Sequence, residues 1–221
     1  GTVMMPRIAA TFASGDHKKV REYMNKSFSF ILLLAFPLMF GIISVSSSFV
    51  PIFYGKGYDK VVSLLCVISP IIILIGLSNV TGTQYLLPTK KQNQYTLSVV
   101  VGAIVNFILN LILIKHFASI GASIATVIAE LVVTATQFIL IRKEIKFIDV
   151  AKLSYKYVIA SLIMFICSMI VGHFIKDNFL SIILQVMVSC FVYFIFLYIL
   201  NDKLIIEAVN KVGNKLRKEV K

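Results

Sequence analysis

The chain has 221 residues, of which 58% are hydrophobic and only 14% are charged, and its mean hydropathy is +0.91. Soluble domains carry roughly 25% charged residues, so this composition excludes an ordinary soluble enzyme or binding module. The formal net charge of +12 would suit a nucleic-acid partner, but the placement of the charges along the chain indicates a membrane protein instead.

The sequence begins with two segments that precede the first long apolar run. Residues 1–13 read like the end of an apolar helix already under way, and we expect them to close a preceding transmembrane helix. Residues 14–26 are charged, with apolar residues at helical spacing, which predicts an amphipathic cytoplasmic linker. Because Gly1 is not an initiator and no cleavable signal precedes it, we expect the chain to be the C-terminal part of a longer protein.

Six apolar runs then follow, each long enough to cross a bilayer as a helix. They lie approximately at residues 27–54, 61–87, 95–114, 120–141, 157–175 and 179–200. The predicted fold class is therefore all-α, a polytopic membrane helix bundle of six transmembrane helices within residues 27–202. Residues 203–221 alternate lysines with a stripe of apolar residues at steps of three and four, which predicts a basic amphipathic tail helix on the cytoplasmic surface. That stripe consists of Ile205, Val209, Val212, Leu216 and Val220.

Proline and glycine interrupt the first two spans. The first contains Pro37 and Gly41, and the second contains Pro70, Gly76 and Asn79. Such residues bend membrane helices where neighbouring groups satisfy the freed backbone amides, as in a transporter that rocks between two states. The plainer interpretation is that proline and glycine are simply common in membrane helices.

The third and fourth spans carry their few polar residues on one stripe each, because residues three or four apart share one face of a helix. The stripes are Ser98, Gly102, Asn106 and Asn110 in the third span, and Ser123, Thr126, Glu130, Thr134 and Gln137 in the fourth. Hydrocarbon offers no hydrogen-bond partner, so a polar stripe faces protein or water. The short connection between these spans predicts an antiparallel pair whose stripes face each other.

Glu130 is the ionisable residue that lies deepest in a span. A charge at the bilayer centre costs about 2.5–3.5 kcal/mol on insertion scales, so this carboxyl should be protonated, paired or hydrated. It is either an ion-coupling or substrate-contacting group, or a structural partner of Asn106, Asn110 or a neighbouring Ser or Thr. The other candidates for a substrate or ion pathway are Asn79, Asn106, Asn110, Thr126, Gln137 and Arg7.

Three basic residues could meet a phosphorylated headgroup. Lys90 and Lys91 lie in the turn after the second span, where topology alone would also explain them. Arg7 follows Pro6 at the cytoplasmic end of the first apolar segment and has the better claim, because a guanidinium fork suits phosphate oxygens.

The fifth and sixth spans carry stripes without any ionisable group, which predicts helix-packing faces rich in small residues. These stripes are Ser161, Ser168 and Gly172, and Ser181, Gln185 and Ser189. The charges in the connections predict the orientation of the spans in the membrane. Of the 22 Lys and Arg residues, 18 lie before the first span or after the second, fourth and sixth. This positive-inside pattern predicts that both ends of the chain are cytoplasmic, and anionic lipid headgroups explain the basic balance without nucleic acid.

The sequence contains no HExxH motif, no phosphate loop with GK[ST] and no GxSxG elbow. The histidines fall at or near predicted membrane edges and the cysteines fall inside spans, in neither case with metal-ligand spacing. These residues are His17, His116 and His173, and Cys66, Cys167 and Cys190. We therefore predict no catalytic residue, no metal site and no cofactor, and the protein is not expected to be an enzyme.

Four sequence stretches, in this order and spacing, resemble the oligosaccharide flippases of the multidrug/oligosaccharidyl-lipid/polysaccharide (MOP) exporter superfamily. They are GTVMMPRIA, LLPTKKQNQY, VGAIVNFILNLILI and GASIATVIAE. The resemblance covers essentially the whole chain and is most specific over residues 86–130. It implies two pseudosymmetric helix bundles around a central cavity, as in MATE-like transporters, of which this chain would be the C-terminal half. On this interpretation we expect the N-terminal bundle to be missing from the chain, and no Lys or Arg lies deep in these six spans to meet a pyrophosphate.

The resemblance implies that an undecaprenyl-pyrophosphate-linked oligosaccharide is moved to the outer leaflet of the bacterial plasma membrane, for capsule, exopolysaccharide or O-antigen synthesis. The partners implied are membrane lipids, this lipid-linked substrate, the missing N-terminal helix bundle, and a polysaccharide polymerase and ligase. Three alternatives stay open: a multidrug or lipid II exporter of the same superfamily, a membrane-embedded polyprenyl-phosphate glycosyl- or acyltransferase, and a non-catalytic scaffold.

Overall fold

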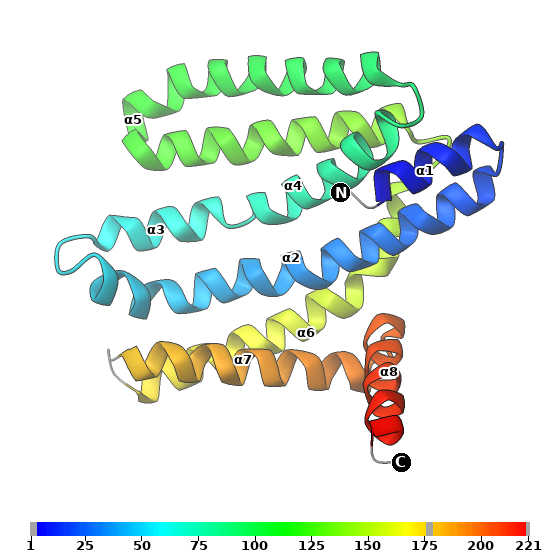
Figure 1. Cartoon of the computed structure of the whole chain (residues 1–221). Helices are drawn as coiled ribbons and strands as arrows, with labels where there is room; N and C mark the ends of the chain where they lie inside the picture. The colour runs from blue at the N-terminus through cyan, green and yellow to red at the C-terminus, as the bar shows by residue number, and fades with distance from the viewer. Residues whose placement is uncertain (1–3, 176–178, 220–221) are drawn as a thin grey trace.

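The computed structural model describes residues 4–175 and 179–219, without the side chains of 212–219, and all regular structure in these ranges is helical. The elements in chain order are α1 (Met4–Ala13), α2 (His17–Phe53), α3 (Asp59–Ile68), α4 (Ile71–Ser78), the π-helix η1 (Asn79–Leu86), α5 (Gln92–Leu140), α6 (Phe147–Phe174), α7 (Phe179–Ile199) and α8 (Lys203–Glu219) (Figure 1). Residues 1–3 of the first predicted segment lie outside this description. The predicted tail stripe from Val212 to Leu216 has no described side chains, and Val220 lies outside the description.

The predicted bundle of membrane helices is confirmed. Five helical stretches are long and apolar enough to cross a membrane, and the longest is the 49-residue α5. Its backbone is non-helical at Ala118, where the chain folds back so that a first arm (92–117) and a second arm (119–140) run antiparallel (Figure 1). The two arms correspond to the third and fourth predicted spans, so the structure contains all six.

A glycine permits the tight turn between the two arms of α5. A Cβ atom at Gly121 would lie only 2.3 Å from the carbonyl oxygen of Leu113. Real side chains do not tolerate such an approach to backbone, so a larger residue here would force the arms apart. The motif GASIATVIAE begins with this glycine, which explains its place at the start of the second arm.

The second span bends, as its proline and glycine content predicts. Helix α3 ends at Ile68, α4 begins at Ile71 after Pro70, and the span closes as the π-helix η1 (Figure 1). Proline removes a backbone donor and clashes with the preceding turn, which accounts for the break before α4. A π-helix has a wider turn than an α-helix and therefore changes which residues share a face.

Helix α2 runs through the centre of the bundle and packs against α1, α3, α4, α6 and α7 (Figure 1). It begins at His17, so most of the predicted linker 14–26 is helical and continuous with the first span, and Asp16 caps it by accepting a hydrogen bond from Lys19 N at 3.0 Å. The apolar core lies at one end of the bundle around Met24 and Phe28 of α2. Elsewhere large apolar side chains are exposed, as expected for helix faces that meet lipid.

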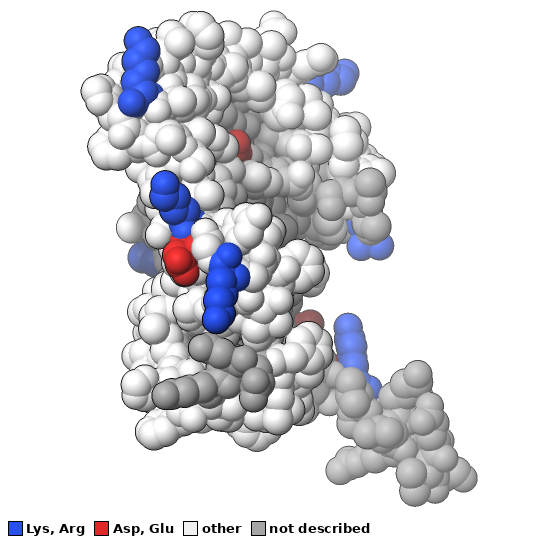
Figure 2. Space-filling view, turned by 90° about the vertical axis from the view of Figure 1, so that its left-hand side faces the viewer, with Lys and Arg blue, Asp and Glu red and all other residues white. Residues whose placement is uncertain are grey.

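The connections alternate between the two ends of the bundle. Figure 2 looks onto the end that carries the 54–58 turn and the fold-back of α5. The described basic residues in the connections at this end are Lys56, Lys60 and Lys115, while the turns 87–91 and 141–146 and the starts of α2 and α8 lie at the other end (Figure 1). The uneven distribution of charge in the sequence therefore becomes a difference between the two ends of the bundle.

Candidate functional site

Glu130 lies in the second arm of α5 and turns toward the second span. Its Oε1 accepts a hydrogen bond of 2.7 Å from the Ser78 hydroxyl at the end of α4. The carboxyl is half-buried, and no ion pair joins it to another described residue. Of the partners considered from the sequence, the structure therefore brings Glu130 to a neighbouring serine and not to Asn106 or Asn110.

Further along the second arm, Gln137 connects three helical segments. The Thr81 hydroxyl of η1 donates to Gln137 Oε1, and Gln137 Nε2 donates to Ser98 Oγ of the first arm at 3.1 Å. Gln137 and both of its partners are buried. One turn earlier, the Thr134 hydroxyl donates to the carbonyl oxygen of Leu74 in α4 at 3.2 Å. The amide and hydroxyl groups of this stripe are thus satisfied by protein, as the low polarity of a bilayer requires.

These contacts define what we call the acidic seam. It consists of Ser78 and Thr81 in the second span, Ser98 in the first arm, and Glu130, Thr134 and Gln137 in the second arm. The polar stripes of the two α5 arms contact each other only in part. Ser98 of the first arm bonds to Gln137 of the second. Gly102 packs so closely against the second arm that a Cβ there would lie 2.2 Å from Val133 Cγ2. The main polar partner of the second arm is the second span.

Asn106 and Asn110 bond to each other within the first arm. Asn110 Nδ2 donates to Asn106 Oδ1 and to the Asn106 carbonyl oxygen, both at 2.9 Å. Thr126, on the other arm, donates to its own helix at the Ala122 carbonyl oxygen, also at 2.9 Å. These three side chains are half-buried and make only local hydrogen bonds, so they keep acceptor and donor capacity for another group.

The other two candidates make no hydrogen bond to the side chains of the acidic seam. Asn79 begins η1 and accepts from Gln84 Nε2 at 3.2 Å, so it bonds along the π-helix rather than across the bundle. Arg7 is exposed on α1, and no described carboxylate forms an ion pair with it. Its guanidinium therefore remains available to an anionic group.

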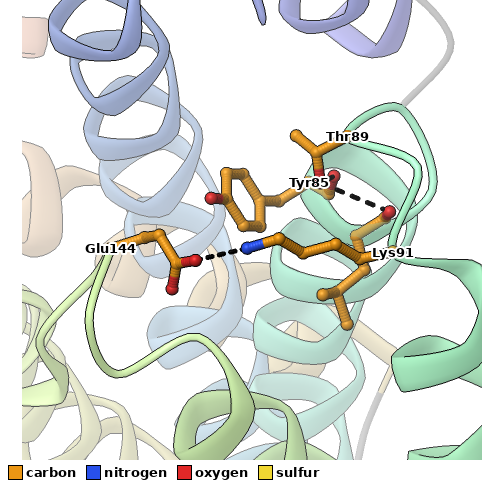
Figure 3. A network of polar contacts seen from close by, with 5 residues as sticks. Tyr85, Thr89, Lys91 and Glu144 are labelled. Atoms are coloured by element: carbon orange, nitrogen blue, oxygen red, sulfur yellow. Dashed lines mark hydrogen bonds and ion pairs between the residues drawn. The ribbon is translucent and has the colours of Figure 1, made fainter.

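Of the two lysines in the turn after the second span, one is held within the protein. Lys91 donates to Glu144 Oε1 and lies beside the Tyr85 ring, 5.4 Å from its centroid (Figure 3). Lys90, by contrast, is exposed. Burial alone would lower the pKa of Lys91, but the hydrogen bond to Glu144 and the attraction of Tyr85 and Glu144 outweigh it, so this pKa is raised.

A second polar region, which we call the neutral seam, joins α2 to α6 and α7. Ser168 donates to Ser44 at 3.0 Å, and Gln185 Nε2 lies 3.0 Å from both Ser48 Oγ and Ser181 Oγ. All five side chains are buried. The stripes of the fifth and sixth spans are confirmed as helix-packing faces.

The sequence did not reveal Ser78, Thr81 and Glu144 as partners of the candidates. Ser78 ends α4 and Thr81 lies in the π-helix that follows, and a π-helix has no recognised sequence signal. Glu144 is an acidic residue in a basic connection, and this is the sequence signal that could have indicated an ion pair there. Among the described residues no group of three His, Cys, Asp or Glu side chains comes together as metal ligands would.

Comparison with known proteins gives consistent relatives. A family model described as lipid II flippase MurJ matches residues 1–200. The lipid II flippase MurJ of Bacillus subtilis is 29% identical over 180 residues, which are 80% of this chain and 32% of that protein. The "Putative O-antigen transporter" of Escherichia coli is 30% identical over 137 residues, 62% of this chain and 33% of the relative.

A solved structure shows the same fold. The lipid II flippase MurJ in its inward closed conformation superposes with a TM-score of 0.78 at 22% identity, over 92% of this chain and 43% of that one. The chain therefore spans between about a third and somewhat under half of the length of the relatives that it matches.

Proposed function

The chain belongs to the lipid II flippase MurJ family, within the MOP superfamily, and on this premise we propose that it forms one bundle of a transporter for lipid-linked saccharides. The complete protein would move a polyprenyl-pyrophosphate-linked saccharide from the cytoplasmic to the outer leaflet of a bacterial plasma membrane. The observation that carries this proposal is the family match over residues 1–200.

Two substrates of this class have support. The family description and the Bacillus relative are named for lipid II, whereas the Escherichia relative is named for O-antigen. The second name agrees with the repeat-unit substrate implied by the resemblance in the sequence. Both substrates join a saccharide to a polyprenyl pyrophosphate, so the same arrangement of a polar path beside apolar helix faces would serve either one.

The candidate residues take the following roles in this proposal. Glu130, in the acidic seam, would change its hydrogen bond to Ser78 as the second span bends, and so couple protonation or ion binding to movement. Asn106, Asn110 and Thr126 would contribute polar groups along the same path. Arg7, exposed on α1, would meet the pyrophosphate, because its fork can bind two phosphate oxygens at once.

The segments outside the six spans also receive roles. Helix α1 would be the end of a preceding span, and both ends of the chain would be cytoplasmic, as the distribution of Lys and Arg indicates. Helix α8 leaves the bundle at a steep angle to α7 and would lie along the membrane surface (Figure 1). A bundle lacking its counterpart would present one wall of a cavity, so transport would need the complementary bundle.

The decisive experiment measures which leaflet holds the lipid-linked intermediates in cells depleted of the protein. Accumulation of intact lipid II on the cytoplasmic leaflet would identify lipid II as the substrate, and accumulation of a repeat unit there would identify the oligosaccharide. If both intermediates still reached the outer leaflet while sensitivity to drugs rose, the flippase proposal would fall and a multidrug exporter would replace it.

A further inference from the structure

A cavity of about 400 Å³ opens at the basic end of the bundle, between the start of α2, the end of η1 and the connection 141–146. This volume lies in the range of small-molecule sites. Its lining includes Lys18, Arg21, Tyr85, Lys143 and Glu144.

The lining of this cavity is positively charged. Three basic residues, Lys18, Arg21 and Lys143, line the cavity together with a single carboxylate, Glu144. This carboxylate already forms an ion pair with Lys91, which is not a lining residue (Figure 3). Arg21 has one acidic neighbour, Asp149, at 3.7 Å, and both of these side chains are about half exposed. The two lysines have no described carboxylate partner. Such a cluster attracts an anion, and its flexible ammonium groups suit phosphate oxygens.

Glu144 adds a second requirement to the ligand. Its Oε1 accepts from Lys91, whereas its other oxygen, Oε2, is buried and receives no hydrogen bond from any described residue. A buried acceptor without a donor costs free energy that a ligand can recover. A ligand that satisfies the whole cavity therefore carries both an anionic phosphate for the basic side chains and a hydroxyl donor for this oxygen.

The surface beside the cavity indicates a lipid rather than a soluble anion. Phe147 and Ile148 follow the connection directly, and they are 59% and 56% exposed. The Phe147 ring packs edge-on against Phe138 of α5, 5.3 Å between centroids, so this exposed apolar side chain is held against the bundle only two residues along the chain from the lining residue Ile145. A free phosphate would leave this surface uncovered, whereas acyl chains would bury it.

We propose that this cavity is a binding site for the headgroup of a glycerophospholipid that carries a hydroxyl, such as phosphatidylglycerol. The phosphate lies among Lys18, Arg21 and Lys143, a glycerol hydroxyl donates to Glu144 Oε2, and the acyl chains cover Phe147 and Ile148. The bound lipid joins the start of α2 to the connection after α5. This inference goes beyond the transported substrate and does not depend on it.

The test uses the full chain in three preparations of phosphatidylcholine nanodiscs. The first contains phosphatidylglycerol, the second contains the same fraction of phosphatidic acid, and the third contains phosphatidylcholine alone. Native mass spectrometry measures the lipid retained, and the melting temperature measures its stabilising effect. We expect phosphatidylglycerol to be retained best, because phosphatidic acid lacks the headgroup glycerol whose hydroxyl would reach Glu144 Oε2 while the phosphate stays among the basic side chains. Lys18→Gln and Lys143→Gln should each weaken its retention about fivefold, the effect of one basic residue at an anionic membrane surface.

Lys152→Gln is the matched control, because Lys152 is exposed on α6 near the same end and lines no part of the cavity; it should leave retention unchanged. Equal retention of phosphatidylglycerol and phosphatidylcholine by the wild type would overturn the proposal. So would a double variant of Lys18 and Lys143 that retains phosphatidylglycerol normally. Inorganic phosphate or pyrophosphate that stabilises the wild type as much as the lipid would assign the cavity to a soluble anion instead.

Discussion

The acidic seam and the neutral seam solve the same problem, polar groups inside a membrane bundle, in different ways. In the neutral seam, buried serines and Gln185 bond across α2, α6 and α7, each of which is one continuous helix, α2 even across its internal Pro37. In the acidic seam, the half-buried carboxyl of Glu130 bonds to a span that is broken after Ile68 and π-helical from Asn79. Regular helices with neutral groups favour permanent packing, whereas an ionisable group against an irregular helix favours a seam that can open.

The first prediction concerns the close packing of the two α5 arms at Gly102. A Cβ at Gly102 would lie 2.2 Å from Val133 Cγ2 and 3.3 Å from the Ala129 carbonyl oxygen. The β-branched side chain of Val133 is stiff at χ1 and cannot easily rotate away. Gly102→Ala should therefore lower the free energy of unfolding by about 2–3 kcal/mol, the upper range for overpacking. Thermal unfolding in detergent measures the loss.

Gly41→Ala in α2 is the control for this change, because nothing lies within 4 Å of its added Cβ. It should be neutral or stabilise the helix by about 0.5–1 kcal/mol. Equal melting temperatures for the two variants would show that the arms of α5 are not closely packed at Gly102.

The second prediction concerns the neutral seam. Gln185→Leu removes the donor that Ser48 Oγ and Ser181 Oγ share, and it should destabilise the protein by about 1–2 kcal/mol. Transport per folded molecule should stay unchanged, because this seam only packs helices. Ser189→Ala is the control, since the buried Ser189 hydroxyl bonds to no described residue. A large loss of transport by Gln185→Leu, at normal folding, would contradict the division of roles between the seams.

The third prediction isolates the charge of Glu130. Glu130→Gln keeps an oxygen that can accept from Ser78, so folding should change little, within about 0.5 kcal/mol. Transport by the complete protein should fall at least about tenfold, equivalent to about 1.4 kcal/mol, because the glutamine cannot ionise. Sidedness of the lipid-linked intermediate measures this effect, and Glu22→Gln, at an exposed position of α2, is the control. Unchanged transport would make Glu130 a structural residue like those of the neutral seam.

The sequence predicted the spans well because hydropathy and helical period are local properties. The bend at Pro70 and the packing stripes of Ser168 and Gln185 followed from the same local rules. The partner of Glu130 did not follow from these rules, because Ser78 stands 52 residues away in the sequence. The π-helix after Ser78 also changes the spacing of the residues that share one helix face. The partner of Lys91 was missed for the same reason of distance in sequence.

The smallest expected effect lies outside both seams, in the pair of Lys91 and Glu144. The pKa of Lys91 is raised above the ordinary lysine value of about 10.4, so the folded state holds this proton more tightly than the unfolded chain does. The contribution to stability is therefore fully present below about pH 10.4 and disappears as the pH rises through the folded pKa. For a partly exposed pair it should be about 0.5 kcal/mol. Melting temperatures of the wild type and Lys91→Gln, compared between about pH 8 and pH 11, should converge at the alkaline end. A constant difference across this range would mean that the Lys91 side chain stabilises the turn by packing against Tyr85, and that the charge contributes nothing there.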